Sequence, residues 1–227
     1  MRKFRAIAVL AGFALVLSAG SAFADGNPVS MDFLNVGPGN NGGGVYTYPY
    51  NFSVNGGPST PLICDTFDNE VTPGETWQAT ATSLTSDLGL FSGQSNSLLN
   101  YEAAGLIYLG ILNGTINSVA GNWAIWALFS SNAYNNPFFS SSGASSIYNT
   151  YLALAGSQSA GQLAAELAGI VVYTPIAGTQ PQGYGLPQEY MGYIQTPEAG
   201  SMAMLGFGLL VIGTAVGRRF FAQASAS

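Results

Sequence analysis

The chain has 227 residues, of which 7% are charged, with a formal net charge of −6 and no histidine. All five cations lie at residues 2–5 and 218–219, and all eleven carboxylates lie between these two groups. A body with carboxylates and no cations repels phosphate, which excludes nucleic-acid binding. The absence of histidine excludes the usual hydrolase triads and the usual zinc ligands. We therefore expect no enzyme, no catalytic residue, no metal and no cofactor.

The first 24 residues have the pattern of a secretory signal peptide. Basic residues at positions 2–5 precede the apolar run 6–17, which is too short to cross a hydrocarbon core about 30 Å thick with ease. Ala22 and Ala24 form the A-x-A pair that precedes signal cleavage. We expect export through the secretion translocon and cleavage after Ala24, with an uncleaved signal anchor as the alternative.

Residues 25–195 are expected to form one extracytoplasmic domain. Residues 26–44 are rich in glycine and asparagine and predict a linker or a set of turns. Strand patterns follow at 45–54, 60–67 and 76–83. Helical patterns follow at 100–112, 121–132, 145–155 and 162–168, and two closing strands at 171–175 and 189–195. This order predicts an α+β fold, with an antiparallel β-sheet layer followed by a small helical bundle.

The C-terminal segment, residues 196–221, has three parts. Pro197, Glu198 and Ala199 stand at its start, and Arg218 and Arg219 stand near its end. Between them, residues 199–217 carry no charge and are long enough for a helix of about 28 Å. We therefore expect a separate C-terminal transmembrane helix at about 199–217, with the arginine pair on the cytoplasmic side.

This three-part tail resembles the PEP-CTERM sorting signal, although the usual third motif residue is proline and Ala199 stands here. The resemblance implies recognition by an exosortase-like membrane peptidase of exopolysaccharide-producing Gram-negative bacteria, with cleavage near Pro197 and Glu198. It also implies an inner-membrane intermediate anchored by the C-terminal helix, and a final place at the outer surface or in the extracellular matrix. An ordinary anchor that is never cut is the alternative.

The body contains one cysteine, Cys64, followed directly by Asp65 in a predicted strand. Residues 122–126 read Asn-Trp-Ala-Ile-Trp in a predicted helix. Together these motifs resemble bacterial thioester-domain-like surface proteins, in which a strand cysteine bonds to a helix glutamine and captures amines covalently. The resemblance implies that Cys64 and Asn122 form the pair. Because asparagine is one methylene shorter than glutamine, we expect a vestigial site with a buried free thiol.

Other motifs leave further functions open. Tyr46, Tyr48 and Tyr50 alternate in the pattern 45–54, so the three rings are expected on one side of an edge strand, where they would contact a glycan. Packing in the core or on the sheet face is the more frequent role of such rings and is the alternative. The acids Asp65, Asp68 and Glu70 are the residues on which a carboxylate-based glycosidase would depend. With Asn69 they offer oxygen ligands to calcium, but the spacing differs from an EF-hand loop and favours a solvated turn.

These observations favour an exported, non-enzymatic protein of the cell surface or extracellular matrix, with a structural or adhesive role. Its expected partners are the translocon, an exosortase-like peptidase, and an exopolysaccharide or other surface polymer. The alternatives are a glycan-binding surface module, a covalent thioester adhesin acting through Cys64, and a carboxylate-based glycosidase.

Overall fold

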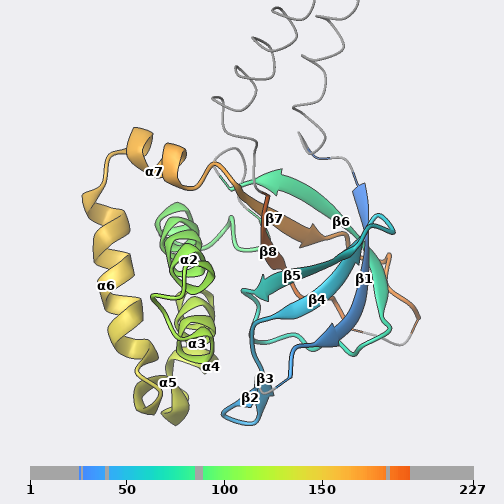
Figure 1. Ribbon diagram of the computed structural model, residues 1–227, viewed down its shortest axis with the longest axis horizontal. Coiled ribbons are helices and arrows are strands. Elements are labelled where there is room, and N and C mark those ends of the chain that lie inside the picture. The colour runs from blue at the N-terminus through green and yellow to red at the C-terminus, as the bar shows by residue number, and fades with distance from the viewer. Residues whose placement is uncertain (1–25, 27, 39–40, 85–88, 183–184, 195–227) are drawn as a thin grey trace, which may run out of the picture. The chain divides into compact units, whose positions relative to one another are not determined.

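Six antiparallel strands close into a β-barrel in the computed structural model of the protein (Figure 1). The structure describes residues 26, 28–38, 41–84, 89–182 and 185–194. The strands follow one another around the barrel in the order β1-β4-β5-β8-β7-β6. Their bounds are β1 Pro28–Val36, β4 Tyr50–Val54, β5 Ser59–Cys64, β6 Thr76–Ser83, β7 Ile170–Pro175 and β8 Tyr190–Tyr193. A separate hairpin consists of β2 Asn41–Gly42 and β3 Val45–Tyr46.

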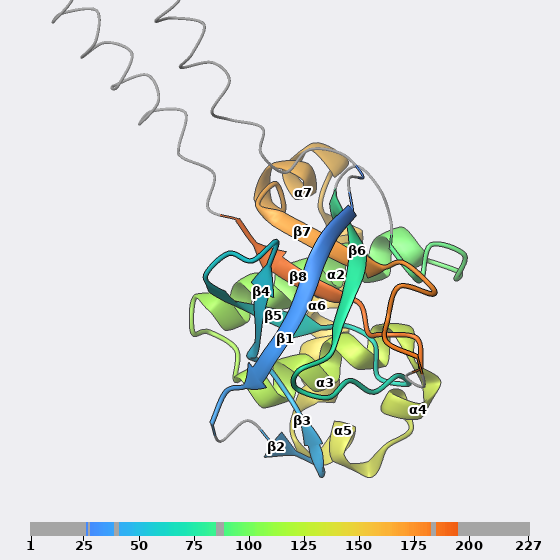
Figure 2. The ribbon, with the colours of Figure 1, turned by 90° about the vertical axis from the view of Figure 1, so that its right-hand side faces the viewer.

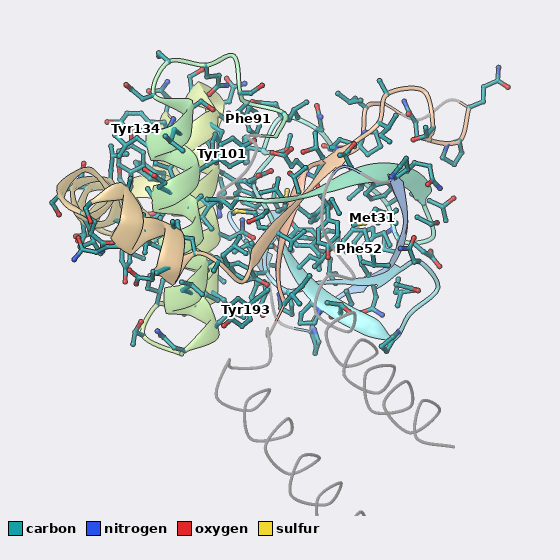
Figure 3. The ribbon with its side chains drawn as sticks, turned by 90° about the horizontal axis from the view of Figure 1, so that it is seen from above. Met31, Phe52, Phe91, Tyr101, Tyr134 and Tyr193 are labelled. Atoms are coloured by element: carbon teal, nitrogen blue, oxygen red, sulfur yellow. The ribbon has the colours of Figure 1, made fainter. Side chains whose placement is uncertain are left out.

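Large apolar side chains fill the barrel. In β1 the buried residues Val29, Met31 and Phe33 alternate with more exposed ones, as the two-residue period of a strand requires. Phe52 of β4 lies at the centre of the packing, with its ring centroid 5.0 Å from that of Phe33 and 4.6 Å from that of Tyr190. Figure 3 shows Met31 and Phe52 within the ring of strands.

Six helices form a layer on one side of the barrel (Figures 1 and 2). Their bounds are α2 Ser97–Leu112, α3 Ser118–Phe129, α4 Ser131–Tyr134, α5 Pro137–Ser141, α6 Ala144–Ser157 and α7 Ala160–Glu166. The α2 and α3 helices consist mostly of apolar residues and are largely buried, as expected for helices enclosed between other elements. Asn117 caps α3 by accepting hydrogen bonds from the backbone N–H groups of Val119 and Ala120.

The predicted open sheet layer followed by a helical bundle is wrong, because the strands form a closed barrel. The closure depends on β1, which we had expected to be a linker. It pairs with β4 on one side and β6 on the other, and β8 pairs with β5 and β7. Each strand of the barrel therefore has two neighbours, and closure leaves the barrel without an open edge.

The membrane prediction is also corrected. In the part of the chain that the structure describes, no helix is long and apolar enough to cross a bilayer. The inner-membrane location that depended on such a helix is therefore wrong for these residues. The predicted helix at 199–217 lies outside the described residues.

Candidate functional site

A groove of about 540 Å³ lies where the β2–β3 hairpin, the loop of residues 67–73 and helix α3 meet. Four aromatic residues line it, of which Tyr46 is exposed, Phe67 is partly exposed, and Tyr50 and Trp126 are buried beneath them. Its polar lining residues include Asn41, Asn69, Glu70, Thr72 and Gln188. Aromatic walls with a few polar groups are the usual composition of a ligand site.

The hairpin wall is held directly against helix α3. The indole N–H of Trp123 donates a 3.1 Å hydrogen bond to the Gly42 carbonyl. A Cβ atom at Gly42 would lie 2.3 Å from a methyl group of Val119, and one at Gly43 would lie 2.9 Å from the Trp123 ring. Gly43 also has φ of +68°, a conformation that glycine adopts most readily. The absence of a side chain at positions 42 and 43 is therefore what lets the hairpin approach the helix.

The opposite wall, residues 67–73, is fixed by Gln188. The side-chain amide of Gln188 donates to the carbonyl oxygens of Thr66 and Asn69, and its oxygen accepts a 2.7 Å bond from the Tyr190 hydroxyl. At the far end of the loop, the Thr72 N–H donates a 2.6 Å bond to the Glu75 carboxylate. The groove is therefore bounded by two anchored segments.

The three tyrosines predicted to contact a glycan do not lie on one strand. Tyr46 ends β3, is 51% exposed and lines the groove. Tyr50 begins β4 and also lines the groove, where its hydroxyl donates a 2.6 Å bond to the Tyr46 carbonyl. Tyr48 lies between the two strands, and its ring packs edge-on against Tyr108 of α2. The expected row of three rings is thus reduced to two groove residues.

The structure brings Cys64 and Asn122 together. The side-chain amide of Asn122 donates a 2.8 Å hydrogen bond to the backbone carbonyl of Cys64. The amide oxygen accepts a 2.8 Å bond from the Tyr48 N–H. The Cys64 thiol donates instead to the Thr66 carbonyl, at 3.2 Å. Both ends of the Asn122 amide are therefore engaged with backbone groups.

The surroundings of Cys64 keep its thiol neutral. The residue is fully buried and unpaired. Burial raises the pKa of the Cys64 thiol far above its ordinary value, and the negative charge of Asp65 raises it further. The Trp126 indole, which also lines the groove, opposes part of this increase. Cys64 is therefore separated from the groove by the groove's own lining, and is held in its unreactive form.

Asp65 is also fully buried, beside Glu189. Its backbone N–H donates to the Glu189 carbonyl at 3.3 Å, and its carboxyl accepts a hydrogen bond from the Thr66 hydroxyl at 3.1 Å. Burial raises the pKa of the Asp65 carboxyl well above its usual range, and the Glu189 carboxylate raises it further. The Asp65 carboxyl therefore keeps its proton to a higher pH than an exposed carboxyl would.

Glu189 joins the barrel to the helical layer, and we did not predict it from the sequence. Its carboxylate accepts hydrogen bonds from the Leu90 N–H (2.6 Å), the Tyr101 hydroxyl and the Thr174 hydroxyl. A Cβ atom at Gly89 would lie 2.0 Å from this carboxylate. The signal that could have identified it is a lone acid in an apolar strand pattern, in a body without cations.

The acids predicted for a glycosidase or a calcium site are separated. Asp65 is buried, whereas Asp68 and Glu70 are exposed, and Asp68 accepts a 2.7 Å bond from the Asn132 amide. Within the described residues, no group of three or more acidic, cysteine or histidine side chains is placed to hold a metal ion. Neither Asp65 nor Glu189 lines the groove.

The remaining predicted residues belong to the signal peptide and the sorting motif. They lie outside the described residues, and are Ala22, Ala24, Pro197, Glu198, Ala199, Arg218 and Arg219.

No family model, curated protein or solved structure matches this chain. The resemblances to the PEP-CTERM signal and to thioester-domain-like proteins therefore stay predictions, and the site is interpreted from its own geometry.

Proposed function

We propose that the domain is a non-enzymatic binding module that holds a glycan in the groove, and that it serves an adhesive or structural role at a surface polymer. The single observation that carries this proposal is the groove itself, in which the exposed ring of Tyr46 and the partly exposed ring of Phe67 lie among polar residues. A sugar ring has an apolar face of C–H groups and an edge of hydroxyl groups. It therefore matches a surface that presents aromatic faces beside hydrogen-bond partners.

The anchoring of both walls supports a binding role over a purely structural one. The hairpin is held by Trp123 and the loop by Gln188. A ligand then meets side chains that are already ordered, so binding costs less conformational entropy. The burial of Asp65 and Glu189 argues against a glycosidase, because neither carboxyl group can contact a sugar in the groove.

The test is binding of the full chain to a glycan array, followed by titration of the best ligands. Tyr46→Ala should weaken binding by about fivefold to tenfold, because it removes the most exposed ring of the groove. Tyr134→Ala is the matched control: that ring is 50% exposed, lies on the helical layer (Figure 3) and does not line the groove. Equal effects of the two variants, or an array without binding, would contradict the proposal.

A second candidate is the covalent adhesin, which the contact between Asn122 and Cys64 favours. In that reaction the sulfur would displace the amide nitrogen of Asn122, and ammonia would leave. Two features oppose this step. The Asn122 amide is already held by hydrogen bonds at its oxygen and at its nitrogen. The raised pKa of the Cys64 thiol disfavours the thiolate that would attack. We therefore propose non-covalent binding, and the mass measurement described in the Discussion distinguishes the two.

We further propose that the protein is exported and sorted by a PEP-CTERM-like system. The basis is the cleavage pair Ala22 and Ala24 and the motif at residues 197–199. A pulse-chase experiment with mass analysis tests this proposal. The mature protein should begin at Asp25 and lack the residues after about Glu198. A full-length chain that persists through the chase would contradict both cleavages.

A further inference from the structure

The charged side chains of the described residues are all acidic. Three of the eleven carboxylates, Asp25, Asp87 and Glu198, fall outside the described residues, which leaves eight within them. None of the five cations of the chain is among the described residues. The described residues therefore contribute a negative field at the groove. This field raises the local concentration of cationic ligands and lowers that of anionic ones.

Within the groove, the carboxylate that can meet a ligand is that of Glu70. The Glu70 side chain is exposed, lines the groove, and forms no hydrogen bond or ion pair with the described residues. The nearby carboxylates have other partners: Asp68 accepts from the Asn132 amide, and Glu75 accepts from the Thr72 N–H. Glu70 is thus the carboxylate of the groove that has no partner among the residues that the structure describes.

The position of Glu70 is set by its neighbours in the loop. The carbonyl of Asn69, one residue before, accepts from Gln188, and the side-chain amide of Asn69 donates a 3.3 Å bond to the Pro187 carbonyl. Two residues after Glu70, Thr72 is held by Glu75. The backbone that carries this charge is therefore anchored on both sides, close to the aromatic groove.

We infer that the groove selects a cationic, amine-bearing glycan, and that Glu70 is the residue that determines this specificity. This inference rests on the proposed function. A protonated amino sugar offers an ammonium group for the Glu70 carboxylate, and the faces of the groove's aromatic rings also attract cations. A uronic-acid polymer is repelled by the same charges. A neutral glycan can use the rings and the amides, and can donate a hydroxyl to Glu70, but it forms no ion pair there.

The experiment titrates the full chain by calorimetry with three hexamers at about pH 6, where a sugar amine is protonated. The probes are a glucosamine hexamer, an N-acetylglucosamine hexamer and a galacturonic acid hexamer. We expect the glucosamine hexamer to bind at least about fivefold more tightly than the neutral one at low ionic strength. This preference should shrink at about 0.5 M salt, where the Debye length is short. We expect no binding of the galacturonic acid hexamer.

Glu70→Gln should remove most of the preference for the glucosamine hexamer over the neutral hexamer, because it removes the charge and keeps the shape of the side chain. Glu166→Gln is the matched control, because it changes the net charge equally. Glu166 is exposed in helix α7, at the opposite end of the domain from the β2–β3 hairpin (Figures 1 and 2).

The possible failures are distinguishable. Equal binding of the neutral and cationic hexamers, still dependent on Tyr46, would overturn the inference and leave the proposed function intact. Equal loss of preference in Glu70→Gln and Glu166→Gln would also overturn it, because the overall charge would then be responsible. Absence of binding to all three hexamers would overturn the inference, and the glycan array would then decide the proposed function separately.

Discussion

The hydroxyl of Tyr101 in helix α2 donates a hydrogen bond to the carboxylate of Glu189, directly before strand β8. This contact connects the helical layer to the barrel through one buried acid, which also holds Leu90 and Thr174. Burial is the main cause that raises the pKa of the Tyr101 hydroxyl far above its ordinary value, and the negative charges of Asp65 and Glu189 raise it further. The phenol therefore stays a donor at any physiological pH.

Removal of the Glu189 carboxylate should destabilise the protein strongly. Glu189→Ala leaves three donors without an acceptor in the interior, and we expect a loss of about 3–5 kcal/mol in the free energy of unfolding. Urea denaturation measures this loss. Glu166→Ala, which removes an exposed acid of helix α7, should change stability by no more than about 0.5 kcal/mol. Similar midpoints for the two variants would show that Glu189 is not a structural acceptor.

The stability of the protein should fall as the pH rises above about 4, because of Asp65. Burial and Glu189 raise the pKa of this carboxyl in the folded state, so the folded protein binds its proton more tightly than the unfolded chain. The stabilising contribution is complete below the unfolded pKa, near 4, and is lost as the pH approaches the folded pKa. For one proton the slope is at most about 1.4 kcal/mol per pH unit.

Asp65→Asn should remove this slope, because the amide copies the neutral carboxyl and does not titrate. Urea denaturation at several pH values between about 4 and 8 compares the two proteins. The variant should be the more stable one at neutral pH. Parallel pH profiles would mean that another group accounts for the slope.

The thiol of Cys64 should be free and unreactive in the folded protein. Intact mass should show no loss of about 17 Da, the mass of the ammonia that a thioester with Asn122 would release. Iodoacetamide should label Cys64 only after unfolding, because the thiol is buried and its pKa is raised. A mass deficit that disappears in Cys64→Ala, with methylamine adding to the wild-type protein, would instead establish the covalent adhesin.

Gly42→Ala should displace the hairpin wall of the groove. The new methyl group would lie 2.3 Å from the Val119 side chain, so we expect a loss of about 1–3 kcal/mol in stability, together with weaker glycan binding. Gly93→Ala provides the comparison, since a Cβ atom there meets nothing within 4 Å. Thermal unfolding and ligand titration of both variants make the test. Unchanged glycan binding by a folded Gly42→Ala protein would show that the hairpin wall does not contribute.

Much of the secondary structure was readable from local patterns. The strand predicted at 76–83 coincides with β6, Thr76–Ser83, because its alternation of apolar and polar residues is uninterrupted. Strand β1 was missed although Val29, Met31 and Phe33 alternate in the same way, since the glycine-rich run that follows dominated the interpretation. Closure of the barrel was not readable, because the pairings of β1 with β6 and of β5 with β8 join segments far apart in the sequence.

The site was less predictable than the strands. The resemblance of Cys64 and Asn122 to a thioester pair led to two residues that are in contact in the structure. The groove was not foreseen, because it combines a hairpin, a loop, a helix and the segment of Gln188, and no one of these carries a recognisable motif. Tyr48 was misplaced because the chain turns between β3 and β4, so an alternation that held in the sequence did not continue as one strand.

The position of β8 has a consequence for the order of folding. This strand, Tyr190–Tyr193, is the last described element in the chain, yet it lies between β5 and β7 and closes the barrel. Until it emerges during synthesis or export, β5 and β7 each keep an unpaired edge that can join to another chain. Strand β5 pairs with a strand that lies more than a hundred residues later in the chain. Such long-range pairing is slow to form. If the chain is exported before it folds, the unpaired edges of β5 and β7 do not form in the cytoplasm.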